Sequence, residues 1–335
     1  MKISILLPAR NEEKVLQRCL DGLSMLNYLK ENLQILLGND NSEDGTLAIM
    51  QNYAKDKPWV EVFDFEEKKE GETLKGKTRV LAKLAHFAKG EYLFFTDADI
   101  EVPPTWIEGI LNESQLMRIS NPTKIPKVGV LVGVTGMRTD SMMAAMQAIE
   151  WLLVIRTNKY FSDKKWPTTG MGNNMAVLKE AYEAVGGYDK IGFSIVEDYT
   201  LYHKIVEKGY DFRQIFTSEV VAYTLPPDHY FEQRKRWIQG AFESKSAPMF
   251  AGIFQAITLP VYVGLYFLNP VFFFVYFAIN FMLYFFMIVS IEKRLNLKGY
   301  LKFLPIFMVY LPVFWFLQLI YFFFKKKVVW KGREY

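Results

Sequence analysis

The chain of 335 residues is long enough for one large domain or two modest ones, and 51% of its residues are hydrophobic. Its net charge of +4 is small for this length, and no basic cluster interleaved with aromatic residues occurs before residue 225, which argues against a nucleic-acid partner. Cys19 is the only cysteine, so an intramolecular disulfide is excluded and a reducing compartment is expected.

Up to about residue 225, short apolar runs alternate with runs of helical apolar spacing. This alternation predicts an α/β fold, in which a mostly parallel sheet is wrapped by helices. The predicted strands cover residues 3–7, 33–37, 59–65, 92–96, 128–134 and 174–177. The predicted helices cover residues 12–26, 44–53, 78–88, 141–155 and 196–208.

Polar segments follow the first two predicted strands, at residues 8–13 and 39–46. Parallel strands end at one edge of a sheet, so both segments would place polar side chains and helix-start N–H groups where a nucleotide binds. The alternative is a purely structural role, in which Asn11 and Ser42 cap the helices that follow.

Residues 71–78 read Gly-Glu-Thr-Leu-Lys-Gly-Lys-Thr, which fits the phosphate-binding loop of a P-loop ATPase. Such a loop should follow its strand at once, but the acidic and Lys-rich stretch 66–70 intervenes. The ATPase is therefore kept only as a distant alternative, and it would leave the motifs further along the chain unexplained.

The predicted strand 92–96 runs directly into Asp97 and Asp99. Side chains alternate along an extended chain, so we expect both carboxylates to point the same way. Two hard oxygen ligands at the end of a strand suit Mg²⁺ or Mn²⁺ bound to a diphosphate. The alternative is a solvated junction between a strand and a turn, where Asp is common.

Glu197 and Asp198 open the predicted helix 196–208. A carboxylate at a helix N-terminus is stabilised in its ionised form by the helix dipole, as a general base requires. A general base is one interpretation of this pair, but the segment by itself favours the other, an ordinary acidic residue in the first helical turn.

Residues 233–237 read Gln-Arg-Lys-Arg-Trp, just before the apolar part of the chain. Helical spacing places Gln233, Arg236 and Trp237 on one face, which could hold an anion and a sugar ring. Arg234 and Lys235 are expected to point away from that face. The alternative is a basic helix that binds only lipid headgroups.

Residues 246–291 carry no charge, and neither do residues 303–324. A span needs about 20 apolar residues, so these runs predict two or three membrane segments. Lys and Arg follow both runs, which places those ends in the cytoplasm. Two prolines, at 305 and 312, make 303–324 the candidate for a re-entrant or in-plane segment.

The expected organisation has four parts: a cytoplasmic domain at 1–228, an interfacial helix at 229–247, a membrane region at 248–324 and a basic tail at 325–335. The N-terminal domain carries no signal peptide, so it is expected to stay in the cytoplasm of a protein that crosses the cell (inner) membrane several times.

In this order the motifs resemble the family 2 glycosyltransferases, inverting enzymes of the GT-A fold. The matching segments are 8–12, 40–46, 97–99, 186–188, 197–198 and 233–237. The closing segment 330–333 is also similar to the tail of members that glycosylate lipids. The resemblance implies a nucleotide-sugar donor and a divalent metal, Mg²⁺ or Mn²⁺, as cofactor.

The resemblance also implies a role for each matching residue. Asp97 and Asp99 would hold the metal, and Asp198 would take the proton from the acceptor hydroxyl. The residues expected at the nucleotide-sugar are Pro8, Ala9, Arg10, Glu12, Asp40, Lys77, Asp97 and Ala98. The residues expected at the acceptor and the diphosphate are Glu197, Gln233, Arg236 and Trp237.

The predicted activity is transfer of one sugar, with inversion, from a UDP-sugar to a lipid or lipid-linked acceptor at the membrane. Two or three apolar segments are few for threading a long polymer, so a processive polysaccharide synthase is the closest alternative. A membrane-anchored nucleotide sensor without catalysis would not need Asp198.

Overall fold

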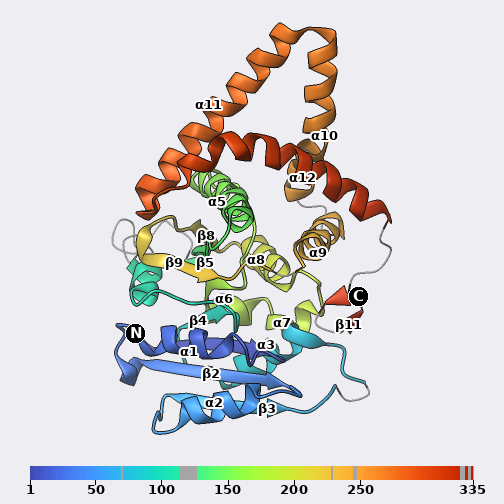
Figure 1. Ribbon diagram of the computed structural model, residues 1–335. Coiled ribbons are helices and arrows are strands. Elements are labelled where there is room, and N and C mark those ends of the chain that lie inside the picture. The colour runs from blue at the N-terminus through green and yellow to red at the C-terminus, as the bar shows by residue number, and fades with distance from the viewer. Residues whose placement is uncertain are drawn as a thin grey trace. The chain divides into compact units, whose positions relative to one another are not determined.

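The computed structural model describes residues 1–68, 71–112, 127–227, 229–243, 247–324, 329–330 and 333–334 (Figure 1). Two compact units form in it. The first unit consists of Met1–Gly136 and Thr157–Leu225, and the second of Met137–Arg156 and Pro226–Tyr335. The expected basic tail at 325–335 lies outside the described residues apart from two short strands.

The strands are β1 (Ile3–Ala9), β2 (Leu33–Asp40), β3 (Val60–Phe65), β4 (Tyr92–Thr96), β5 (Val128–Val132), β6 (Val134–Met137), β7 (Asn174–Leu178), β8 (Asp211–Gln214), β9 (Val221–Thr224), β10 (Val329–Trp330) and β11 (Arg333–Glu334). The helices of the first unit are α1 (Leu16–Ser24), α2 (Thr46–Ala54), α3 (Gly76–Phe87), α6 (Lys179–Ala184), α7 (Gly187–Ile191) and α8 (Glu197–Glu207). Helix α5 (Met142–Asp163) contributes to both units, and the second unit adds α9 (Tyr230–Glu243), α10 (Ala247–Leu268), α11 (Pro270–Leu295) and α12 (Leu304–Phe324).

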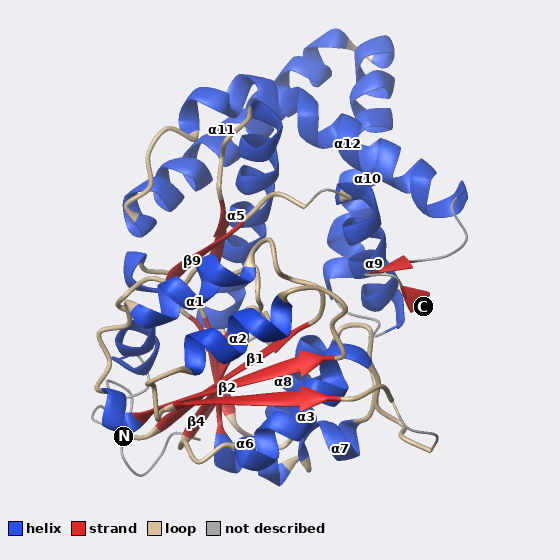
Figure 2. Ribbon diagram, turned by 60° about the horizontal axis from the view of Figure 1, so that its bottom comes forward, coloured by secondary structure: helices blue, strands red, loops and turns tan. Residues whose placement is uncertain are grey.

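A seven-stranded sheet in the order β3-β2-β1-β4-β7-β5-β8 forms the centre of the first unit. Strands β1 to β4 are mutually parallel, and β7 runs antiparallel to both of its neighbours. Chain order reverses between β1 and β4, and ligands of α/β proteins bind at such a point, beyond the carboxyl ends of the strands. Figure 2 shows the arrowheads of β1 and β2 at this one edge.

The strands are continuous apolar runs because helices cover both faces of the sheet. Every residue of β1, β2 and β4 is buried. Right-handed crossovers place α1 and α2 on one face and α3, which returns from β3 to β4, on the other (Figure 2). The mixed, mostly parallel sheet with its helices confirms the predicted α/β fold.

The predicted strand 128–134 is in fact two strands that separate at Gly133. Gly133 donates a backbone hydrogen bond to the carbonyl of Asn174. A Cβ atom at Gly133 would lie only 2.2 Å from the Asn174 Oδ1 atom, so no larger residue fits there. The Asn174 amide donates to the carbonyls of Val134 and Val220, and its Oδ1 accepts from the indole of Trp106.

The first predicted helix begins four residues later than expected, at Leu16. The capping alternative is also wrong, because neither α1 nor α2 has a side-chain cap. Asn11 and Ser42 instead tie two loops together. The Asn11 amide donates to Ser42 Oγ at 3.0 Å, and Asn11 Oδ1 accepts from the amide of Glu43 at 2.9 Å.

In the second unit, α10 packs against α11 and α12, and α9 packs against α10 and α12. Asn269 separates α10 from α11, and its side chain caps α11 by accepting from the amide of Val271 (Figure 1). Pro312 lies inside α12 and does not end that helix. Within the described residues, two stretches are long and apolar enough to cross a membrane, Pro270–Leu295 and Leu301–Phe324.

Candidate functional site

The carboxylate pair lies at the predicted place, directly after β4 at the carboxyl edge of the sheet. The chain there is not extended, however, because the amide of Ile100 donates to the carbonyl of Asp97 and closes a turn. The alternation argument for Asp97 and Asp99 is therefore wrong. Two different partners hold the carboxylates: Lys77 contacts Asp97, and Thr224 Oγ1 donates to Asp99 Oδ2 at 3.1 Å.

Lys77 joins two of the predicted site motifs. It lies in the first turn of α3, and its Nζ atom is 2.6 Å from Asp97 Oδ1 and 3.1 Å from Glu197 Oε1. Burial would lower the pKa of Lys77, but Asp97, Glu197 and Asp198 together raise it well above its ordinary value. The ammonium group is therefore permanently charged, although its side chain remains 32% exposed.

Asp198 is held in the first turn of α8 by backbone N–H groups. Its Oδ2 atom accepts from the amide of Gly172 at 2.7 Å, and its Oδ1 atom accepts from the amide of Tyr199 at 2.8 Å. Burial, with a contribution from Glu197, raises the pKa of Asp198 to about 6, while Lys77 opposes that rise. A carboxylate with a pKa near neutrality can accept a proton and release it again.

Gly172 makes this arrangement possible because it approaches both charged groups closely. A Cβ atom at this position would lie 3.2 Å from Asp198 Cβ and 3.3 Å from Lys77 Nζ. Gly170 is similarly constrained, since its Cβ atom would meet the Asp198 carbonyl oxygen at 2.5 Å. The segment before β7 thus lies against the N-terminus of α8, at the edge where β7 begins.

Hydrogen bonds join the loop after β1 to the loop after β2 at the same edge of the sheet. The Glu12 amide donates to Thr46 Oγ1 at 2.7 Å, and Arg10 Nη1 donates to the carbonyl of Asp40 at 3.0 Å. Pro8 and Ala9 are buried within β1. Ala98 is buried in the turn after β4.

Asp40, one of the residues expected at the nucleotide-sugar, forms a buried ion pair with Arg79. Asp40 Oδ1 lies 3.4 Å from Arg79 Nη1, and both side chains are almost fully buried. Arg79 also contacts Glu72 Oε2 at 2.7 Å and donates to the carbonyl of Glu66. The guanidinium therefore fixes the carboxylate of Asp40 and ties β2 to the segment before α3.

The donor set fits a small divalent cation. Mg²⁺ is usually bound by one or two carboxylates together with substrate phosphates, and Asp97 and Asp99 supply two carboxylates here. Within the described parts of the chain, no group of three or more His, Cys, Asp and Glu side chains forms a metal site by itself. A cation at this position would therefore need further ligands from a bound substrate.

Several residues of the site had no signal in the sequence. They act through contacts between distant segments, which motif spacing does not reveal. Glycine pairs such as Gly170 and Gly172 hint at close approach, but they do not tell what approaches them. The residues that sequence reasoning missed are Cys19, Arg79, Gly170, Gly172 and Thr224.

The predicted residues Gln233, Arg236 and Trp237 lie on α9 in the second unit, and each is partly exposed. The expectation that Arg234 points away from their face is wrong, because Arg234 donates to Gln233 Oε1 and lies over the Trp237 ring. Both Arg234 and Lys235 are buried, at 3% and 4% exposed. Arg234 contacts Glu150 on α5, and Lys235 Nζ lies over the ring of Phe322 on α12. The two cations therefore pack inside the second unit.

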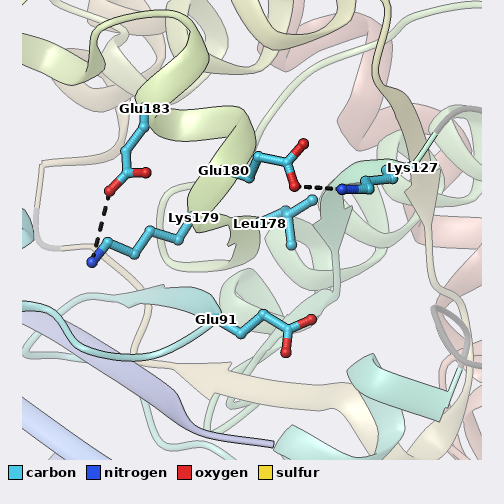
Figure 3. A pocket seen from close by; sticks show the side chains of 6 residues that line it. All are labelled: Glu91, Lys127, Leu178, Lys179, Glu180 and Glu183. Carbon is cyan, nitrogen blue, oxygen red and sulfur yellow. Dashed lines mark hydrogen bonds and ion pairs between the residues drawn. The ribbon is translucent and has the colours of Figure 1, made fainter.

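A separate pocket lies at the opposite edge of the sheet, where β4 begins and β7 ends (Figure 3). Its charged side chains pair with one another: Lys127 contacts Glu180 at 2.5 Å, and Lys179 contacts Glu183 at 3.7 Å. None of the predicted site residues lines it. The chemistry of the chain is thus concentrated at the carboxyl edge.

Carboxylates at the end of a central strand, beside hydrogen-bonded loops at the switch point of a mostly parallel sheet, are the arrangement expected of the GT-A fold. Residues 4–186 match the family described as Glycosyl transferase family 2. The chain belongs to this family.

Among solved structures, the fold resembles the mannosyltransferase PcManGT from Pyrobaculum calidifontis, solved in complex with GDP-Man and Mn²⁺. The match has a TM-score of 0.56 at 18% identity and covers 97% of this chain and 88% of that one. At this identity it supports the GT-A fold alone, and the fold prediction is confirmed.

Two curated relatives match over most of the chain. The "Probable glycosyltransferase YdaM" of Bacillus subtilis is 25% identical over 247 residues, which cover 71% of this chain and 55% of that protein. The beta-monoglucosyldiacylglycerol synthase of Trichormus variabilis is 23% identical over 253 residues, covering 72% and 49%. The chain thus spans about half the length of the curated relatives that it matches.

Proposed function

We propose that this glycosyltransferase transfers a sugar, with inversion, from a UDP-sugar to a hydroxyl group of a lipid or lipid-linked acceptor. The observation that carries the proposal is the cluster in which Lys77, Asp97, Glu197 and Asp198 meet at the carboxyl edge of the sheet. It combines a candidate base with a candidate diphosphate site.

On the donor side, Asp97 and Asp99 would hold Mg²⁺ or Mn²⁺, which neutralises the charge that develops on the leaving diphosphate. Lys77 lies beside Asp97 and would add a fixed positive charge at the same place. The backbone of Pro8, Ala9 and Ala98 would approach the nucleotide. Arg10, Glu12 and Asp40 would border the nucleotide from the two cross-linked loops.

On the acceptor side, Asp198 would accept the proton of the attacking hydroxyl. Its two N–H contacts, from Gly172 and Tyr199, fix the orientation of the carboxylate. They also favour the ionised form, so burial raises the pKa only to about 6 and the base is ionised at neutral pH. The oxygen of the acceptor hydroxyl would attack the sugar carbon from the face opposite the diphosphate, so the configuration of that carbon would be inverted.

The family motif is the basis for proposing that Gln233, Arg236 and Trp237 on α9 bind the acceptor and the diphosphate. Arg236 offers a planar fork for the diphosphate, and the Trp237 indole offers a flat surface for a sugar or for the entrance of the acceptor. The partial exposure of all three side chains on α9 supports such a role.

A lipid acceptor follows from the apolar helices and from one relative. Helix α11 exposes large apolar side chains such as Phe272, Phe274 and Phe286, which water would not favour. We infer that the protein crosses the cell (inner) membrane and keeps its first unit in the cytoplasm, because Lys293 and Arg294 close α11. A diacylglycerol glucosyltransferase is among the distant relatives.

The test is a donor screen on the full chain in detergent, with UDP-glucose, UDP-galactose, UDP-N-acetylglucosamine and GDP-mannose. We expect release of UDP from one UDP-sugar and, with diacylglycerol present, a lipid product one sugar heavier. A ladder of products would favour the processive synthase instead. No turnover of any nucleotide-sugar, under conditions where the folded protein binds UDP, would contradict the proposal.

A further inference from the structure

The second unit contains a buried ion pair that contacts the proposed acceptor face of α9. Arg234 Nε lies 3.4 Å from Glu150 Oε1, and the two side chains are 4% and 6% exposed. Both residues belong to the second unit, Glu150 on α5 and Arg234 on α9. A buried charge needs a partner of opposite charge, and here Arg234 and Glu150 are partners of each other.

Tyr230 completes the pair. Arg234 Nη2 donates to the Tyr230 hydroxyl at 2.7 Å, and that hydroxyl donates to Glu150 Oε2 in a short hydrogen bond. Burial and the neighbouring Glu150 raise the pKa of Tyr230 well above its ordinary value, so the phenol keeps its proton. The three side chains therefore form one connected polar cluster between α5 and α9.

The same guanidinium contacts two residues of the proposed acceptor face. Arg234 Nη1 donates to Gln233 Oε1 at 3.4 Å, and Arg234 Cζ lies 4.3 Å from the ring centroid of Trp237. Trp151, the neighbour of Glu150 on α5, packs against Trp237 with ring centroids 4.8 Å apart. The Trp237 indole thus contacts both a cation and a second indole, and both contacts are favourable for an aromatic ring.

We propose that Arg234, held by Glu150, is a positioning residue that fixes the Trp237 ring and the Gln233 amide for the acceptor. This inference rests on the proposed function of the α9 face. Because Glu150 on α5 holds the cation, rotation of α9 would break the ion pair and the ring contacts together, and rotation of the indole alone would break the ring contacts. Errors of about 1 Å in placing a reacting group can cost about 10²-fold in rate.

The decisive variant is the double substitution Glu150→Gln with Arg234→Met. It removes both charges, so no unpaired charge stays buried, and the glutamine can still accept from Tyr230. Thermal unfolding should therefore stay close to that of the wild type. The signal of the Trp151–Trp237 pair is obtained by subtracting the near-ultraviolet circular dichroism spectrum of Trp237→Phe from that of the wild type. The double variant should lose this signal.

The kinetic readout is transfer to diacylglycerol in mixed phosphatidylcholine vesicles, with the UDP-sugar that turns over fastest in the donor screen. We expect kcat/KM for the acceptor to fall by about 10²-fold. Binding of UDP with Mn²⁺, measured by calorimetry, should change less than about twofold because Asp97, Asp99 and Lys77 are untouched. Arg234→Lys keeps the charge but loses the planar group, so it should unfold close to the wild type and recover only part of the transfer that the double variant loses.

Lys235→Met is the matched control, since Lys235 is an equally buried cation of the same helix that lies over Phe322 instead. It should leave the acceptor KM and the tryptophan signal unchanged. Full transfer by the folded double variant or by Arg234→Lys would overturn the inference, and so would an equal loss in Lys235→Met. Full transfer by Trp237→Ala would instead refute the proposed role of the α9 face itself.

Discussion

The two units each contain a cluster of charged side chains, and the clusters balance their charges differently. In the first unit, the single cation Lys77 faces Asp97 and Glu197 in direct contact, with Asp198 close enough to raise the lysine pKa. In the second unit, the single cation Arg234 pairs with the single carboxylate Glu150. The first cluster has more negative than positive charge and is partly exposed, whereas the second is matched and buried.

This difference distinguishes the proposed catalytic site from a contact that holds two helices in place. Excess carboxylates at an accessible edge favour the binding of a further cation, and burial together with Glu197 raises the pKa of Asp198 to about 6, as a catalytic base would require. A matched pair out of reach of solvent contributes orientation instead. Substitutions in the first cluster should therefore change turnover, and substitutions in the second should change stability and placement.

The largest expected effect follows from removing Asp99, the proposed metal ligand two residues after Asp97 of the first cluster. Asp99→Asn should abolish measurable sugar transfer, because the neutral amide is a poor ligand for a hard divalent cation. EDTA should silence the wild type, and added Mg²⁺ or Mn²⁺ should restore it. Thr224→Val, which loses only the hydrogen bond to Asp99 Oδ2, serves as the milder control. Full activity in EDTA would refute the metal assignment.

The next effect concerns stability in the second cluster. Arg234→Met alone leaves the Glu150 carboxylate buried without its charge partner, which should cost about 3–5 kcal/mol. The double variant Glu150→Gln with Arg234→Met should unfold close to the wild type. The measurement is the midpoint of thermal unfolding in detergent, which should be lower for Arg234→Met than for the double variant and the wild type. Equal destabilisation by the single and the double variants would show that packing, and not charge, dominates this region.

A smaller effect is expected on the pH profile of transfer. Lys77 lowers the pKa of Asp198, so Lys77→Met should raise that pKa further. Because the base works only when ionised, the acid limb of the rate profile should move to higher pH. Lys83→Met on the same helix, which loses a pair with Glu72 at 2.9 Å, should leave the limb in place. An unshifted limb in Lys77→Met would mean that Asp198 does not govern the rate.

The last prediction is that the protein has no ATPase activity. Lys77 contacts Asp97 and Glu197 in this fold, and α3 begins at Gly76, well after β3 ends at Phe65. The purified protein should therefore hydrolyse ATP no faster than the background in a phosphate-release assay. A robust Mg²⁺-dependent ATPase that disappears in Lys77→Ala would contradict the transferase account.

Sequence reasoning recovered the sheet and the carboxylates at its carboxyl edge because those features leave local signals. Continuous apolar runs mark buried strands, and carboxylates directly after β4 mark the edge where parallel strands end. The contact between Arg79 and Asp40 leaves no such signal, since it joins residues far apart in the chain. The packing of Asn174 against Gly133 has the same character and divides a run that otherwise reads as one strand.

The prediction for α9 failed for a related reason. Helical periodicity placed Gln233 and Trp237 on one face and pointed Arg234 away from it, but the structure brings both residues into contact with Arg234. Its counter-charge is Glu150, more than 80 residues earlier, on a different helix. A buried pair of this kind becomes visible only once the two helices are packed.

The most direct test of the account is a comparison of Asp198→Asn with the wild type on the same preparation. The asparagine preserves shape but cannot accept a proton, so transfer should fall by at least about 10²-fold while UDP-sugar affinity, measured by calorimetry, is retained. In the wild type, transfer should rise with pH through about 6 as the carboxylate ionises, and it should then level off. Unchanged transfer by Asp198→Asn, with the same rise through about 6, would contradict the assignment of Asp198 as the base.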